Sequence, residues 1–121
     1  MRQSVKIGPD YVCAEMVGRT SASQTRRFVE KQVAALRKSG LRRLLVSVRA
    51  SRPLFKVQEW DFLSVLDEMA GMKGLKVALV SDTKELAMTH EYAALLGRQR
   101  RVALRAFRNE REAVAWLLGT A

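Results

Sequence analysis

The sequence has little cysteine, proline or glycine, and it has no long uncharged run. Its 121 residues include one cysteine, two prolines and seven glycines. The single cysteine, Cys13, cannot form an internal disulfide, and so few prolines and glycines leave no room for a flexible linker. The longest stretch without a charged side chain is residues 113–121, whereas a membrane-spanning helix needs about 20 apolar residues. These scarcities exclude a disulfide-rich scaffold and predict a single domain over residues 1–121 with no membrane-spanning segment.

Residue types that carry catalysis are also scarce. His90 is the only histidine, and its helical spacing predicts a packed side chain in preference to a general base. Cys13 lies in an apolar stretch, where a thiol is usually inert. One histidine and one cysteine cannot build a zinc site, and the sequence has no glycine-rich phosphate loop. We therefore expect no catalytic residue, no metal and no cofactor, and we expect that the protein is not an enzyme.

Acidic residues are few compared with basic ones. The chain has 22 Lys and Arg against 12 Asp and Glu, a net charge of +10. The excess of basic residues lies in residues 1–56 and 97–121, whereas residues 57–96 have a net negative charge. Such a charge permits an anionic partner, and it equally suits a solvated surface that confers solubility. No apolar run follows the first residues, so we expect no secretory signal and a cytoplasmic location.

What the chain does have is a regular alternation of strand-like and helix-like segments. Strands are predicted at 5–7, 11–17, 43–48, 76–80 and 102–107, and helices at 23–38, 57–69, 83–96 and after Asn109. Capping pairs are predicted at Ser21 with Gln24, Asp82 with Glu85, and Asn109 with Glu112, and helix ends at Gly40 and Gly97. The predicted class is α/β, with a mixed four- or five-stranded sheet, helices mainly on one face, and the order β-β-α-β-α-β-α-β-α.

Apolar spacing predicts which helical residues are buried. The expected core residues are Phe28, Val29, Val33, Ala35, Leu36, Val57, Trp60, Phe62, Leu63, Leu66, Met69, Leu86, His90, Ala93, Ala94, Ala113, Val114, Trp116, Leu117 and Leu118.

Two stretches of the sequence support a family resemblance. Residues 77–82 read Val-Ala-Leu-Val-Ser-Asp, and the closing stretch has a strand to Phe107, then Asn109, an acidic turn and Ala-Val-Ala-Trp-Leu at 113–117. With the element order, these resemble the SpoIIAA-like group of the STAS superfamily over nearly the whole chain. The resemblance implies a protein that acts by binding and not by catalysis.

The same resemblance directs attention to Ser51. Anti-sigma-factor antagonists of the superfamily carry a phosphorylatable serine at the start of the helix after the third strand, with an Asp at the end of that strand. Ser51 is the closest hydroxyl here, but the Asp is missing and Arg49 and Arg52 flank it. We therefore expect Ser51 to form a turn before Pro53 and not to act as a phosphorylation switch.

An anion site is a further hypothesis, argued from topology. In open sheets with parallel strands, ligands favour the crevice beyond the carboxyl ends of the strands, where helices also begin. The residues predicted there are Arg49, Ser51, Arg52, Ser81, Asp82, Arg108 and Asn109. Asp82 and Asn109 also suit helix caps, which would occupy the same amide donors.

The remaining cations form two clusters at predicted helix ends. They are Arg37, Lys38, Arg42 and Arg43 after the first helix, and Arg98, Arg100 and Arg101 after the third. Parallel crossovers should bring both clusters to one edge of the sheet, where they could dock on acidic lipid, nucleic acid or an acidic protein. Cations at the carboxyl ends of helices also have a structural reason, because they interact favourably with the partial negative charge of the helix dipole there. Nucleic acid is disfavoured because no aromatic residues alternate with these cations and no recognition helix is evident.

Taken together, the sequence predicts a non-catalytic binding or regulatory module that acts through a protein partner or its own dimer. The alternative is a peripheral membrane protein, or one that binds lipid or another anion, through the basic edge.

Overall fold

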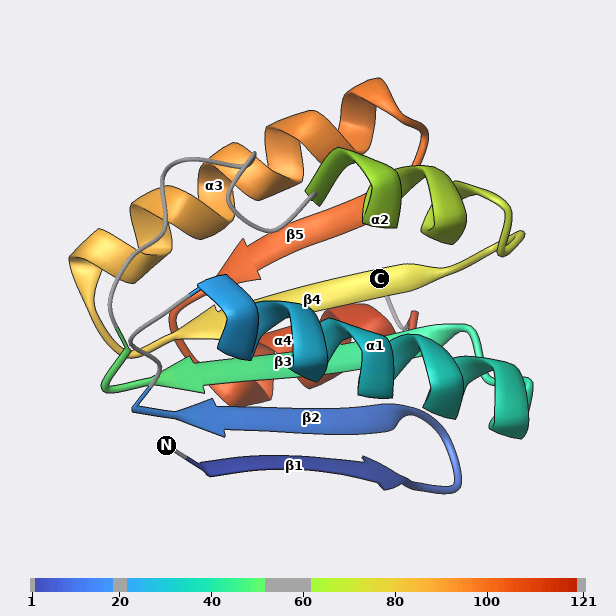
Figure 1. Ribbon diagram of the computed structural model, residues 1–121, viewed down its shortest axis with the longest axis horizontal. Coiled ribbons are helices and arrows are strands. Elements are labelled where there is room, and N and C mark those ends of the chain that lie inside the picture. Colours follow the sequence, from blue (N-terminus) through green and yellow to red (C-terminus); the bar gives the residue numbers. More distant parts are fainter. Residues whose placement is uncertain (1, 19–21, 52–61, 120–121) are drawn as a thin grey trace.

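Strands and helices follow one another in the predicted order (Figure 1). The structure, a computed structural model, describes residues 2–18, 22–51 and 62–119. Its strands are β1 (Arg2–Ile7), β2 (Val12–Val17), β3 (Arg43–Arg49), β4 (Lys76–Ser81) and β5 (Ala103–Phe107). Its helices are α1 (Ala22–Ser39), α2 (Phe62–Ala70), α3 (Lys84–Gln99) and α4 (Glu110–Leu117).

The strands form one mixed sheet in the order β1-β2-β3-β4-β5. β1 pairs with β2 in the antiparallel sense, from Arg2 opposite Val17 to Ile7 opposite Val12. The other three pairings are parallel. The predicted class, element order and antiparallel opening hairpin are therefore confirmed, although β1 begins three residues before the predicted strand.

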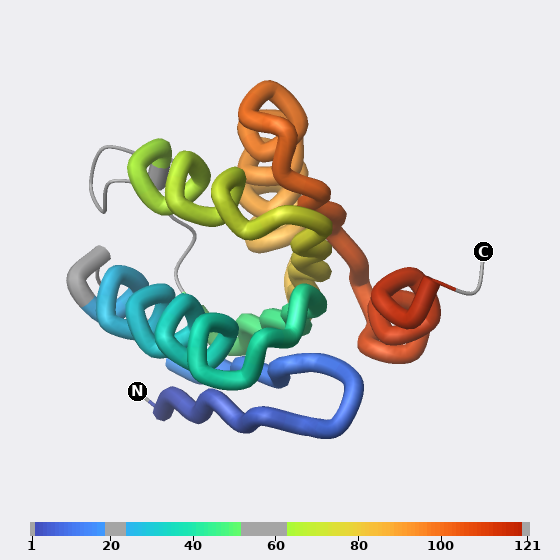
Figure 2. Tube along the Cα trace, turned by 90° about the vertical axis from the view of Figure 1, so that its right-hand side faces the viewer, coloured from blue at the N-terminus to red at the C-terminus, as the bar shows by residue number. Residues whose placement is uncertain are grey.

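Helices cover the two faces of the sheet unequally. α1, α2 and α3 lie on one face and α4 lies on the other (Figure 2). β3 is buried on both faces because its side chains alternate: Leu44 and Val46 join the core under the three helices, while Leu45 joins the smaller core under α4. Within the described residues, no helix combines the length and the apolar character needed to cross a membrane.

Local chemistry explains several helix ends. Gly40 adopts φ +74° just after α1, and its N–H donates to the Leu36 carbonyl over 2.9 Å. Only glycine adopts this conformation without strain, so the predicted C-terminal cap is confirmed. Asn109 caps α4 as predicted, because its side-chain oxygen accepts from the Glu112 N–H over 2.8 Å.

Four local predictions are wrong. The N-cap of α3 is Thr83 and not Asp82, whose carboxylate accepts from the Ala50 N–H over 3.0 Å instead. α3 continues past Gly97 to Gln99.

Two residues predicted in the core are exposed. Leu63 is 37% exposed, because each step of three residues rotates a helix position by about 60°, which turns Leu63 away from the buried Met69. Leu118, also predicted in the core, is exposed to the same extent. Ser21, Val57 and Trp60 lie outside the described residues, as does the side chain of Phe62.

Candidate functional site

The predicted anion-site residues lie where the parallel strands end, but most of their polar groups are engaged within the fold. Arg49 Nη2 donates to Glu15 Oε2 over 3.1 Å, and Ser51 Oγ donates to the Arg49 carbonyl over 2.9 Å. The Asp82 carboxylate accepts a hydrogen bond from the Ala50 N–H, and the side-chain oxygen of Asn109 accepts one from the Glu112 N–H.

Two other members of this set differ in exposure. Ser81 is fully buried, whereas Arg108 is exposed to solvent. Arg52 lies outside the described residues. The anion site stays a prediction, and of its described cations Arg49 already has a carboxylate partner.

The two basic clusters lie at the opposite end of the sheet. Arg43 opens β3 and lies in register with Lys76, which opens β4, and the Lys76 N–H donates to the Arg42 carbonyl over 2.9 Å. Ala103, just after the second cluster, lies opposite Lys76 on β5. We call this the basic edge; its members are Arg37, Lys38, Arg42, Arg43, Arg98, Arg100 and Arg101.

Acidic residues of α2 compensate part of the basic edge. Arg37 Nη2 lies 2.5 Å from Glu68 Oε1, and Arg100 Nη1 lies 2.5 Å from Asp67 Oδ1. All four side chains are substantially exposed, so each pair contributes only about 0–1 kcal/mol to stability. α2 is thereby linked to α1 on one side and to the end of α3 on the other.

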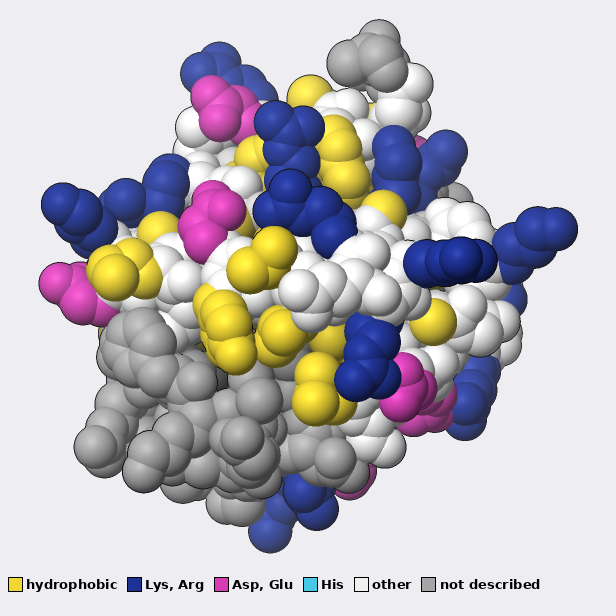
Figure 3. All heavy atoms as spheres, turned by 90° about the horizontal axis from the view of Figure 1, so that it is seen from above, with side chains coloured by type: hydrophobic (Ala, Val, Ile, Leu, Met, Phe, Trp, Pro, Cys, Tyr) yellow, Lys and Arg dark blue, Asp and Glu magenta, His cyan; other side chains and the backbone are white. Residues whose placement is uncertain are grey.

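The outer face of α3 carries exposed apolar side chains, which the sequence analysis missed. Met88, Tyr92 and Leu95 are 58%, 44% and 47% exposed. Their spacing of four and three residues places them in one row along the helix, which we call the α3 stripe. Figure 3 views this side of the molecule and shows hydrophobic side chains gathered beside positively charged ones.

A signal for this stripe exists in the sequence. Positions 88, 92 and 95 have the same helical periodicity as the buried row that contains Leu86 and His90. When a helix has apolar side chains on two of its sides, a sheet that packs against one side leaves the other exposed. The exposed Glu85 and Glu91 lie on either side of the stripe, and Arg98 follows it at the basic edge.

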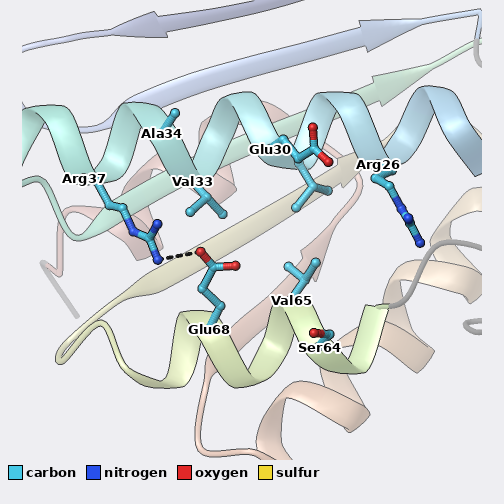
Figure 4. A pocket seen from close by; sticks show the side chains of 9 residues that line it. Arg26, Glu30, Val33, Ala34, Arg37, Ser64, Val65 and Glu68 are labelled. Atoms are coloured by element: carbon cyan, nitrogen blue, oxygen red, sulfur yellow. Dashed lines mark hydrogen bonds and ion pairs between the residues drawn. The ribbon is translucent and has the colours of Figure 1, made fainter.

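A groove separates α1 from α2 (Figure 4). It has a volume of about 370 Å³ and is lined by Arg26, Val29, Glu30, Val33, Ala34, Arg37, Ser64, Val65 and Glu68. Valines from both helices line its apolar part, and the charged side chains come mainly from α1. The ion pair between Arg37 and Glu68 crosses the groove near one end (Figure 4).

Cys13 lies half-buried on the face of the sheet that α4 partly covers. Burial raises the pKa of the Cys13 thiol, and the negative charge of Glu110 raises it further. Burial also raises the pKa of the Tyr11 hydroxyl, and the neighbouring Cys13, Glu110 and Asp10 raise it further. A raised pKa keeps the thiol protonated near neutral pH, so Cys13 lacks the thiolate that a nucleophile requires.

Within the described residues, no three His, Cys, Asp or Glu side chains come close enough together to hold a metal ion. His90 is buried, as its spacing predicts. No protein-family model matches the chain, and no curated protein matches its sequence. The function must therefore be argued from the surface and the interior of this molecule.

Proposed function

We propose that the protein is a non-catalytic binding module that docks an acidic protein partner on the α3 stripe. The observation that carries this proposal is the row of exposed apolar side chains at Met88, Tyr92 and Leu95. Tyrosine and methionine are enriched in protein interfaces, where an apolar centre is surrounded by a polar rim. The resemblance to the SpoIIAA-like group, whose members act by binding, supports the same class of function.

Charge indicates the kind of partner. The chain carries a net charge of +10, and although Glu85 and Glu91 flank the stripe, its carboxyl end leads to Arg98 and the rest of the basic edge. Two copies of such a chain repel each other, whereas an acidic protein is attracted and steered to the surface. We therefore favour an acidic partner over self-association. A reducing cytoplasm suits this function, because a chain with one cysteine needs no disulfide.

Photo-crosslinking tests the proposal directly. A photoreactive phenylalanine analogue is placed at Tyr92, and, as a control, at the exposed Ser4 on β1. After irradiation in cell extract, mass spectrometry identifies the captured protein. We expect one acidic protein captured from position 92 but not from position 4, and loss of that product when Met88→Ser and Leu95→Ser are combined.

The same samples can contradict the proposal. Equal capture from both positions, or a captured product that survives the two serine substitutions, would show that the stripe is not the docking surface. Light scattering on the purified protein tests for self-association. If the wild-type protein is a dimer and the combined Met88→Ser, Leu95→Ser variant is a monomer, the partner at the stripe is a second copy of the chain and not an acidic protein.

The basic edge favours a second candidate, docking on an anionic membrane. Each cation near anionic lipid contributes on the order of 1 kcal/mol, and Ile7, 48% exposed, begins the hairpin turn at the same end of the sheet. Co-sedimentation with phosphatidylserine vesicles separates the two functions. Vesicle binding that is lost in the Arg42→Gln, Arg43→Gln variant and in high salt would favour the membrane over the protein partner.

A further inference from the structure

A second, partly enclosed cavity adjoins the groove between α1 and α2. It has a volume of about 100 Å³ and lies between the three helices and the sheet. Its lining comes from β2 to β5 and from α1, α2 and α3, and most of the lining side chains are apolar. Val29 and Val65 line both the cavity and the groove, so the two spaces adjoin. A molecule entering from the groove would pass between these valines.

One polar group in the cavity has an unused hydrogen-bond donor. Gln32 of α1 lines the cavity and is only 2% exposed, and its Nε2 makes no hydrogen bond in the structure. Buried side-chain amides in native proteins nearly always have a partner, because an unpaired donor forfeits its hydration without compensation. Thr25 and His90 also line the space.

We propose that this cavity binds a small apolar compound with a carbonyl oxygen, which accepts a hydrogen bond from Gln32 Nε2. The apolar part of the compound packs against side chains such as Val46, Met69 and Leu104. An apolar cavity of about 150 Å³ accommodates benzene, so this smaller space suits a compound, or the end of a longer chain, of at most about six heavy atoms. The rest of a longer molecule would lie in the groove.

The geometry favours this ligand over a water molecule. Gln32, Thr25 and His90 provide the two to four polar groups that an internal water needs, but a water would leave the mostly apolar walls of this cavity without contacts. A carbonyl compound needs only one donor, which Gln32 supplies, and its hydrocarbon part suits the remaining walls. The site is independent of the α3 stripe, since none of the three stripe residues lines it.

Two probes of nearly equal shape test the proposal. Cyclopentanone and methylenecyclopentane differ only in whether an oxygen or a CH₂ group projects from the ring. Each is titrated into the ¹⁵N-labelled protein, and dissociation constants are obtained from amide shifts. We expect saturable shifts for residues that line the cavity. We also expect the affinity ratio of ketone to hydrocarbon to fall about fivefold in Gln32→Leu, because one hydrogen bond is lost.

Two further variants make the result specific. Gln99→Leu makes the same substitution at an exposed position of α3 and should leave the affinity ratio unchanged. Ala93→Leu adds a larger side chain to the cavity wall and should abolish binding of both probes while Gln32 is retained. Dispersed amide spectra confirm that each variant is folded.

The proposal is overturned if neither probe gives saturable shifts in the wild-type protein, which would leave the cavity empty or hydrated. It is equally overturned if Gln32→Leu leaves the ratio unchanged, since Gln32 would then not recognise the carbonyl. Because the readout does not involve the α3 stripe, failure here would leave the proposed docking function standing.

Discussion

At the scale of single residues, Gly97 shows how closely α3 packs on the sheet. A Cβ added at this position would lie 2.5 Å from Leu104 Cδ1 and 3.1 Å from Leu104 Cβ and Cγ. Alanine favours a helix over glycine by about 1 kcal/mol, but overpacking a core typically costs about 1–3 kcal/mol. We predict that Gly97→Ala lowers the free energy of unfolding by about 1 kcal/mol in urea denaturation.

A second background isolates the cause of that loss. In a Leu104→Ala protein the crowding atoms are absent, so Gly97→Ala should become neutral or stabilising there through helix propensity alone. An equal loss in both backgrounds would mean that the contact with Leu104 is not what requires a glycine.

Cys13 offers a second test at the same scale, this time of electrostatics. Burial and the charge of Glu110 both raise the pKa of its thiol, so less thiolate is present at a given pH than for a free cysteine. We predict that the rate of alkylation by iodoacetamide rises with pH along a curve displaced to higher pH than that of a cysteine peptide. Glu110→Gln should move the curve part of the way back, because burial is the larger cause and is unchanged. A curve that coincides with the peptide's would contradict the raised pKa.

At the scale of elements, α2 is short and depends on its neighbours. Its nine residues are linked to α1 by Arg37 with Glu68, and to the end of α3 by Arg100 with Asp67. Because both pairs are exposed, their loss should change the global stability by less than about 1 kcal/mol each. Local opening of α2 needs less free energy than global unfolding, so it should respond more clearly.

We therefore predict that the Asp67→Asn, Glu68→Gln variant shows faster amide hydrogen exchange in α2, with the unfolding midpoint hardly changed. Replacing the exposed Glu91 of α3 by Gln removes one negative charge without breaking either pair and serves as the control. Exchange that accelerates equally in all helices would indicate global destabilisation and contradict a local role for the pairs.

How far the sequence predicts an element depends on how local its determinants are. The run at β3 and the caps at Gly40 and Asn109 are set by adjacent residues, and all three were predicted. The cap of α3 was not, because Asp82 bonds to Ala50, 32 positions away. Helical periodicity predicted the buried row with Leu86. The same periodicity also marks a second apolar row with Met88, but it does not indicate which of the two rows stays exposed, since that depends on which face the neighbouring elements cover.

At the scale of the whole molecule, topology determined what could be anticipated about candidate sites. Parallel crossovers bring the carboxyl ends of α1 and α3 to one end of the sheet, so the gathering of cations there followed from the predicted element order. The partners of those cations did not, because the rotation of α2 that presents Glu68 to Arg37 depends on tertiary packing. The cavity beside Gln32 was equally inaccessible to sequence reasoning, since its volume is what three packed helices leave unfilled.

The concentration of cations at one end should make the stability of the whole protein depend on salt. With a net charge of +10, the folded state brings like charges closer together than the unfolded chain does. Raising the ionic strength from about 0.01 M to 0.15 M shortens the screening length from about 30 Å to 8 Å. Screening weakens this repulsion more than it weakens the few exposed ion pairs. We predict that the melting temperature rises over this range.

Neutralising two cations tests whether the basic edge causes that dependence. Arg42→Gln with Arg43→Gln removes two exposed cations from the edge, and the matched control, Arg27→Gln with Arg108→Gln, removes two exposed cations elsewhere. The edge variant should melt at a higher temperature than the control in low salt, and its melting temperature should change less with added salt. Equal behaviour of the two variants would mean that total charge matters and its placement does not. If placement matters, an anionic partner that neutralises the basic edge should stabilise the fold by reducing the same repulsion that salt screens. This effect adds to the stabilisation that any ligand provides by binding only the folded state.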